Sequence, residues 1–239
     1  HTEIAFPFIE RKLPVFIEKP FTQSLKDARK IVRASQKSNS PVMVGHLHLY
    51  SHAYAEAKKL LKNIGVINLM VGEGASNGPH REDYSVLWDY APHDISMMLD
   101  MMGEMPTSVE AWGISTLRPS TKLYDTSYLK LNFPRGTTGI IFSSSLMSQK
   151  RKRLTVVGEK GSIVYDDVLS ENKVSFFGED GKDTLYPIYE TTPPLTLELQ
   201  AFLETVQIGA KPKTDAQNGL EGIAILEAAE KSIAKNGQQ

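Results

Sequence analysis

The strongest constraint on the fold is a change of sequence pattern near residue 66. Before it, helical patterns alternate with short apolar runs: a helix tail at 1–11, a strand at 14–17, a helix opened by Ser24, a strand at 41–45 and a helix at 53–64. Strands that alternate with helices are typical of a parallel sheet with crossover helices. The sequence therefore predicts that the chain begins in an α/β arrangement.

After residue 66, strand patterns dominate. A strand-like segment at 66–74 and a polar loop at 77–85 lead to one helix, and seven strand-like segments follow at 108–116, 126–133, 138–145, 151–158, 162–165, 173–177 and 184–188. Short turns separate several of these segments, which favours antiparallel pairing. The predicted fold class is α/β then α+β, in which a parallel sheet precedes a mixed, mostly antiparallel open sheet covered by helices on one face.

Two helical patterns, at 195–208 and 219–235, close the chain. Apolar residues at helical spacing predict the buried face of the first of them. The residues expected inside are Leu195, Leu199, Phe202, Leu203 and Val206.

Composition excludes several classes of protein. The 239 residues carry a net charge of −1, which argues against nucleic acid or an anionic membrane as partner. No run of about 18 apolar residues and no secretory leader is apparent, and no cysteine is available for a disulfide or a thiolate metal site. These features fit a cytoplasmic protein. His46, His48 and His52 lie close in sequence, but without a carboxylate-rich loop we expect no metal there.

The segment 87–103, LWDYAPHDISMMLDMMG, carries the most distinctive chemistry. Pro92 suits the first position of a helix that ends at Gly103. His93 lies in its first turn, where the helix dipole favours a neutral imidazole that can accept a proton. Asp89, four residues earlier, could orient that imidazole. Alternatively, Asp89 and Asp94 only cap the helix and His93 is a surface residue.

Residues Glu18-Lys19-Pro20 directly follow the first strand. Ligands of open α/β sheets bind beyond the carboxyl ends of the strands, so these side chains are suitably placed. A lysine held beside a substrate hydroxyl could stabilise negative charge on its oxygen as a hydride leaves. Alternatively, Lys19 is an exposed lysine paired with Glu18.

Taken in order, these motifs resemble the Gfo/Idh/MocA family of NAD(P)-dependent sugar and polyol dehydrogenases. The resemblance runs through HTEIAFPFIERKLPVFIEKPF at 1–21, VMVGHLHLYSHAYAEAKKLL at 42–61, DYAPHD at 89–94, the strands at 143–167 and the closing helices at 194–232. It implies that residues 1–45 are the C-terminal remnant of a dinucleotide-binding Rossmann domain. Residues 46–239 would form the substrate-binding and oligomerisation domain.

The resemblance also implies residue roles. Lys19 matches the lysine that binds the reacting hydroxyl, His93 the general acid/base and Asp89 the acid beside it, so that Lys19 and His93 are expected to approach one cleft. The remaining implied sites are the cofactor contacts His1, Glu18, Lys19 and Pro20, and the substrate contacts His46 and Tyr50. Arg81 and Tyr84, in the loop that also holds His80, are assigned to substrate binding because this loop precedes the helix mouth.

The implied activity is oxidation of a sugar or sugar-nucleotide hydroxyl by hydride transfer to NAD or NADP. Oxidation of inositol or another polyol or diol is an alternative, and so is a non-catalytic sensor that binds dinucleotide or sugar without turnover. The retention of Lys19, Asp89 and His93 together argues against the sensor. The basic residues 150–153 could meet nucleotide phosphates or form a solvated face.

One element of the family pattern is missing. The glycine-rich G-x-G-x-x-G turn that holds the pyrophosphate does not occur, and Gly72-Glu73-Gly74 is followed by a loop instead of a helix. We therefore expect the 239 residues to be part of a longer protein and to be inactive alone. The resemblance further implies a homodimer or homotetramer that pairs through the face of the large sheet.

Overall fold

The computed structural model describes residues 1–181 and 184–235, which divide into two compact units. Unit 1 consists of residues 1–51 and 192–227, and unit 2 consists of residues 52–191 together with the chain from 228 onward. Each unit is described separately. Within the described ranges, no helix is long and apolar enough to cross a membrane.

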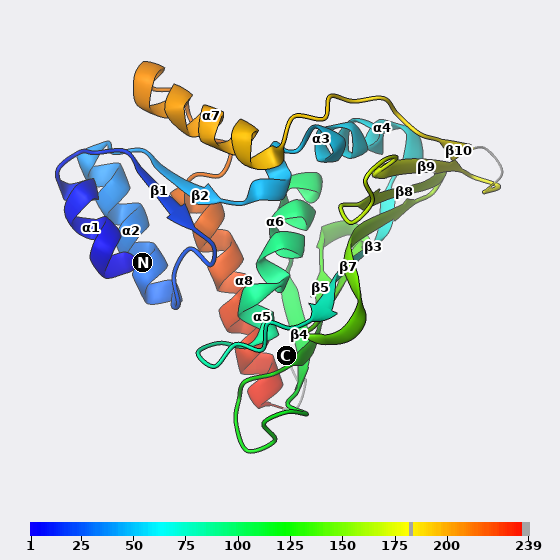
Figure 1. Cartoon of the computed structure of the whole chain (residues 1–239), viewed down its shortest axis with the longest axis horizontal. Helices are drawn as coiled ribbons and strands as arrows, with labels where there is room; N and C mark the ends of the chain where they lie inside the picture. The colour runs from blue at the N-terminus through cyan, green and yellow to red at the C-terminus, as the bar shows by residue number, and fades with distance from the viewer. Residues whose placement is uncertain (182–183, 236–239) are drawn as a thin grey trace. The chain divides into compact units, whose positions relative to one another are not determined.

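Unit 1 is built on a short parallel sheet. Its elements are α1 (Thr2–Glu10), β1 (Val15–Glu18), α2 (Leu25–Ser38) and β2 (Val42–Gly45), and Figure 1 shows the two helices beside the two strands. The register runs from Val15 opposite Val42 to Glu18 opposite Gly45. Ser24 caps α2 by accepting a hydrogen bond from the Asp27 amide. The predicted helix and strand alternation of this region is confirmed.

Three more elements complete unit 1: the 3₁₀ turn η1 (Leu47–Tyr50), α7 (Pro194–Ile208) and the first part of α8 (Ala216–Ala234). The buried face predicted for α7 is wrong except for Phe202, which packs against Phe16 of β1. Leu195, Leu199, Leu203 and Val206 are 45–53% exposed, whereas Glu198 and Thr205 are buried. The helix therefore turns a polar pair towards the unit and leaves its leucine stripe outside.

Unit 2 contains the large sheet. Its elements are α3 (His52–Lys59), α4 (Leu61–Ile64), β3 (Ile67–Asn77), α5 (Val86–Asp89), α6 (Ala91–Met102), β4 (Ser108–Ile114), β5 (Thr126–Asn132), the turn η2 (Pro134–Gly136), β6 (Thr138–Ser144), β7 (Leu146–Gly158), β8 (Gly161–Asp166), β9 (Val174–Gly178) and β10 (Thr184–Leu185). The strand order is β10-β9-β8-β7-β3-β6-β5-β4. Among the described strands of this sheet, β3 and β6 pair in parallel, and the other pairs are antiparallel. The predicted mixed, mostly antiparallel sheet is confirmed.

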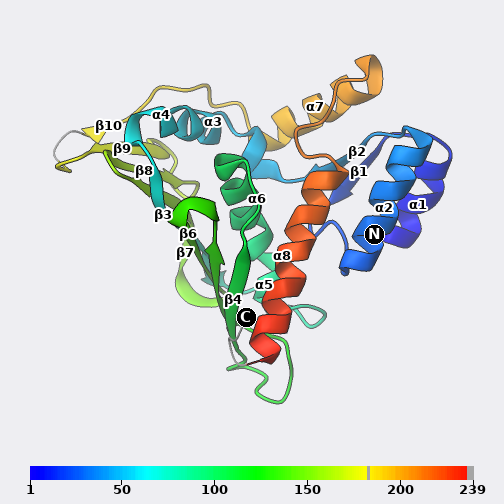
Figure 2. The ribbon, with the colours of Figure 1, turned by 180° about the vertical axis from the view of Figure 1, so that it is seen from behind.

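Helices cover one face of this sheet. Seen from behind in Figure 2, α6 runs along the strands, and a methyl group built on Gly139 of β6 would lie 2.9 Å from the Met98 sulfur. Tyr54 of α3 packs edge-on against Tyr165 of β8, with ring centroids 5.9 Å apart. Side chains of the opposite parity, including Trp112, Tyr128 and Ile140, are 38–46% exposed. The covering of one face was part of the predicted fold class, and it is confirmed.

Candidate functional site

The end of β1 gathers the residues that were assigned to the nicotinamide end of a cofactor. Glu18 is the last residue of β1, and its Oε2 accepts a hydrogen bond of 3.3 Å from the Lys19 amide. The same oxygen lies against Gly45 of β2, since a methyl group built there would be 3.0 Å away. Nδ1 of His1 lies 3.0 Å from the Pro20 carbonyl oxygen. Glu18, Lys19 and Pro20 thus form a turn at the carboxyl end of β1, and His1 lies against this turn.

His46 follows β2 directly and is 5% exposed. Burial, together with the smaller effects of the positive charges of Lys19 and His48, lowers its pKa from 6.5 to about 4. Its Nδ1 has no hydrogen-bond partner among the described residues. A neutral imidazole with an unused ring nitrogen is therefore held beside the turn that carries Lys19.

Tyr50 ties η1 to the segment that precedes α8. Its hydroxyl oxygen lies 2.9 Å from Thr214 Oγ1 and accepts a hydrogen bond of 3.3 Å from the Thr214 amide. Thr214 Oγ1 in turn donates to the Val44 carbonyl of β2. Burial raises the pKa of Tyr50. The hydroxyl is thus engaged within unit 1, although the sequence assigned it to substrate.

Glu198 belongs to the same end of unit 1 and was missed by sequence reasoning. It is 1% exposed, and its Oε1 has no hydrogen-bond partner within the part of the chain that the structure describes. Burial raises its pKa to about 7, with a smaller contribution from the negative charge of Glu18. The signal available was its spacing of four from Phe202, which places both on one helix face. The more regular leucine stripe obscured that signal.

In unit 2, α5 and α6 meet at the segment that carries Asp89 and His93. Helix α6 begins at Ala91, one residue before the predicted start, and His93 lies in its first turn as expected. Asp89 is 7% exposed, and its Oδ2 lies 3.6 Å from Arg81 Nε. The arginine therefore shares the Asp89 carboxylate that was expected to serve His93.

Asp94 does not cap this helix, which corrects that alternative. It is 3% exposed and packs over Gly72 of β3, where a methyl group would lie only 2.7 Å from its Cγ. Burial raises the pKa of Asp94 to about 8, assisted by the negative charge of Glu73. Gly72 therefore makes room for a carboxyl group that is mostly neutral at pH 7.

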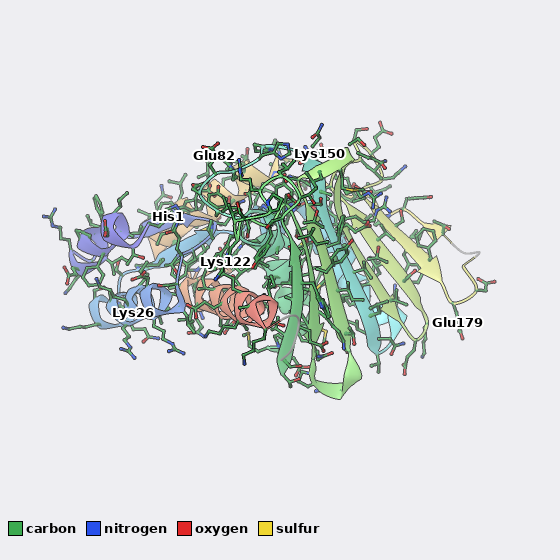
Figure 3. The ribbon with its side chains drawn as sticks, turned by 90° about the horizontal axis from the view of Figure 1, so that it is seen from below. His1, Lys26, Glu82, Lys122, Lys150 and Glu179 are labelled. Atoms are coloured by element: carbon green, nitrogen blue, oxygen red, sulfur yellow. The ribbon has the colours of Figure 1, made fainter. Side chains whose placement is uncertain are left out.

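The loop predicted to bind substrate lines a pocket within unit 2. His80, Arg81, Tyr84 and Asp89 face a second segment from Leu117 to Asp125, and Figure 3 labels Glu82 and Lys122 on these two stretches. The segments are joined by Arg118, whose Nη1 donates to the Arg81 carbonyl at 2.6 Å. The Arg81 guanidinium lies 5.5 Å from the centre of the Tyr84 ring. Planar cations, carboxylates and an aromatic ring are suited to binding a hydroxyl-rich molecule.

Two other candidate sites, for phosphate on β7 and for a metal at the neighbouring histidines, have little support. Two of the basic residues of β7 are paired with acids: Arg151 Nη1 lies 3.0 Å from Glu73 Oε1, and Arg153 Nη2 lies 2.9 Å from Asp166 Oδ2. Charge already neutralised within the sheet is less available to phosphate. The described residues contain no group of three or more potential metal ligands, the three neighbouring histidines included.

Comparison with family models gives two matches. Residues 1–46 match the model "Oxidoreductase family, NAD-binding Rossmann fold", and residues 56–164 match "GFO/IDH/MocA C-terminal domain". The two matches follow each other along the chain and divide it near the end of β2.

Individual relatives extend the likeness over the whole chain. Myo-inositol 2-dehydrogenase from Thermotoga maritima is 26% identical over 247 residues, covering 98% of this chain and 74% of the relative. Among solved structures, UDP-N-acetylglucosamine 3-dehydrogenase GnnA from Acidithiobacillus ferrooxidans has a TM-score of 0.89 at 18% identity, covering 100% of this chain and 76% of that one. An inositol dehydrogenase homologue from Azotobacter vinelandii, complexed with NADH and myo-inositol, has a TM-score of 0.85 at 17% identity, covering 100% and 74%. At these identities the two structures establish the fold.

Proposed function

Because this chain belongs to the Gfo/Idh/MocA family of NAD-binding oxidoreductases, we propose that it serves the oxidation of a sugar or sugar-nucleotide hydroxyl. The observation that carries the proposal is the turn at the end of β1, where Glu18 seats the Lys19 backbone against β2. The neutral His46 lies beside this turn. Such a turn presents an ammonium group at the edge where ligands of parallel sheets bind.

In the proposed reaction, Lys19 Nζ donates a hydrogen bond to the substrate oxygen and stabilises the negative charge that develops on it. His93 takes the hydroxyl proton as general base, and Asp89 favours the imidazolium that results. Arg81 forms an ion pair with the Asp89 carboxylate, and this pairing limits how strongly Asp89 can act on His93. The two catalytic groups lie in different units, and their action on one hydroxyl is part of the proposal.

The cofactor implied by the family fits this chain in part. His1, Glu18, Lys19 and Pro20 would hold the nicotinamide end, next to the unused Nδ1 of His46. The sequence has no G-x-G-x-x-G turn for the pyrophosphate. A bound nicotinamide would supply the hydride acceptor. The residue that distinguishes NAD from NADP would follow the second strand of such a domain, so both cofactors stay in the proposal.

A cyclic polyol is the second candidate substrate. It is favoured by the similarity to myo-inositol 2-dehydrogenase, which extends over 98% of the chain. The pocket residues Arg81, Tyr84 and Arg118 suit either candidate, because both present several hydroxyl groups.

We also propose that unit 2 pairs with a second copy through the uncovered face of its sheet, giving a homodimer or homotetramer. Trp112, Ile114, Tyr128 and Ile140 are 38–50% exposed on neighbouring strands of that face. An apolar patch of this kind is typical of an interface. Light scattering at micromolar concentration would give the mass, and a monomer would contradict the pairing.

The function is tested with a chimera. The glycine-rich half of the Rossmann domain of the Thermotoga maritima relative is joined ahead of His1, and NADH formation is measured with free sugars, UDP-N-acetylglucosamine and myo-inositol. We expect activity with one class of substrate and none from the unextended chain. A chimera that binds NAD but oxidises none of them would favour the sensor, the alternative from another class of protein.

A further inference from the structure

Helix α7 places a carboxyl group directly over the end of β1. Phe202 of α7 packs edge-on against Phe16 of β1, with ring centroids 5.7 Å apart. Glu18 follows Phe16 by two residues on the same side of the strand, a rise of about 6.6 Å. Glu198 precedes Phe202 by four residues on the same helix face, a rise of about 6 Å. The charge of Glu18 acts on Glu198, so the two carboxyl groups lie on the same side of this ring contact. Because the two rises match, Glu198 comes to the level of Glu18.

The surroundings of Glu198 disfavour its charged form. The side chain is 1% exposed, and its Oε1 has no partner among the described residues. Burying a carboxylate without hydrogen bonds is costly, and a second carboxylate nearby adds repulsion. Burial first and Glu18 second raise the pKa of Glu198 to about 7.

Other charged and titratable groups at this point come from the elements packed on α7. Glu18 and the adjoining Lys19 approach from β1, and Tyr50 from η1. Asp215, which also faces Tyr50, adds a further negative charge, and Lys213 donates from Nζ to the Leu49 carbonyl of η1 at 3.0 Å. Among these groups, it is the negative charge of Glu18 that raises the pKa of Glu198.

We propose that Glu198 is a positioning residue for Lys19 and that it acts through Glu18. As a neutral acid, Glu198 leaves the Glu18 carboxylate seated between Gly45 and the Lys19 amide. As a carboxylate, it repels Glu18 and loosens the hydrogen bond that fixes the backbone of Lys19. The effect of Glu198 on catalysis rests on the proposed function, because that function assigns Lys19 its catalytic role.

The test follows the Lys19 backbone amide by two-dimensional ¹H–¹⁵N NMR of the full 239-residue chain, from pH 5.5 to 8.5 without cofactor. We expect the Lys19 resonance to shift with a midpoint near pH 7, as Glu198 titrates. Glu198→Gln keeps the shape and the neutral charge, so its Lys19 resonance should stay at the low-pH position throughout. Glu204→Gln, on the same helix with an exposed side chain, is the matched control and should titrate like the parent.

A second variant tests the pair. Glu18→Gln removes the repulsion while leaving a side chain of equal size, so the carbonyl band of protonated Glu198 in infrared spectra should disappear at a lower pH than in the parent. A Lys19 amide that does not respond between pH 6 and 8, or that responds equally in Glu198→Gln, would overturn the proposal. Neither measurement uses NAD or turnover, so a failure here is distinct from a failure of the proposed oxidation.

Discussion

The polar clusters of the two units are assembled in different ways. In unit 1, Glu18, His46 and Glu198 come from β1, the end of β2 and α7, and up to 180 positions of sequence separate them. In unit 2, Arg81, Asp89 and Asp94 lie within 14 consecutive positions. The cluster of unit 2 is made by one segment and depends on local helix geometry. The cluster of unit 1 depends on the packing of α7, which is distant in sequence.

The two clusters also differ in how a carboxyl group packs against a glycine, since Asp94 is buried and Glu18 is exposed. Asp94 in unit 2 is fixed on a helix over Gly72, where even a methyl group would lie 2.7 Å from Cγ. Glu18 in unit 1 meets Gly45 with the far end of a flexible side chain, 3.0 Å from such a methyl group. The contact in unit 2 is therefore rigid, and that in unit 1 can adjust.

The largest expected effect tests whether both clusters serve one reaction. In the active chimera, His93→Ala should lower turnover about 10²- to 10⁴-fold through loss of the general base. Lys19→Ala should lower it about 10²- to 10³-fold through loss of charge stabilisation at the oxygen. Steady-state kinetics with circular dichroism as a control of folding would measure both. Near-normal turnover of both variants would contradict the proposed roles of Lys19 and His93.

A smaller effect is expected from adding one methyl group to each glycine. Gly72→Ala should lower the free energy of unfolding by about 1–3 kcal/mol, because Asp94 cannot withdraw without moving α6. Gly45→Ala should cost less, since the Glu18 carboxyl group can rotate away. Calorimetric unfolding of the two variants gives the comparison. Equal losses would contradict the distinction between a rigid and an adjustable contact.

The pH dependence of unit 2 should follow Asp94. Its pKa is about 8 in the folded chain and 3.8 unperturbed, so the folded state keeps a proton that the unfolded state releases between these values. Stability should therefore fall as the pH rises from 4 to 8. Asp94→Asn removes this dependence while retaining the shape. The difference in unfolding temperature between the two proteins, measured from pH 5 to pH 8, should grow steadily, and a constant difference would refute the assignment.

The elements and candidate residues could be predicted from the sequence where the signals for them are local. Pro92 marked the start of α6 to within one residue, and Gly103 marked its end. Lys19 was chosen as a candidate because it directly follows a predicted strand, and its role stays a prediction. The burial of Asp94 was not predicted, and an alternative interpretation made it a cap, because the glycine that receives it lies 22 positions earlier on β3. Glu198 was missed for the same reason, since only the packing of α7 on β1 shows which side of that helix is inside.

The pH dependence expected from His46 is smaller than that expected from Asp94 and has the opposite sign. Its pKa is about 4 in the folded chain and 6.5 unperturbed, so between these values the unfolded state binds a proton that the folded state lacks. Stability should fall as the pH drops from 6.5 to 4, because charging the imidazole requires its exposure. His46→Gln keeps a polar group that does not titrate, and should reduce this fall.

His52→Gln is the control, since His52 lies on α3 with a 35% exposed side chain near Glu190. Unfolding temperatures from pH 4.5 to pH 6.5 should separate the His46 variant from both the parent and the control. Parallel curves for all three proteins would mean that burial does not keep His46 neutral, and that the two clusters do not respond to pH in opposite directions.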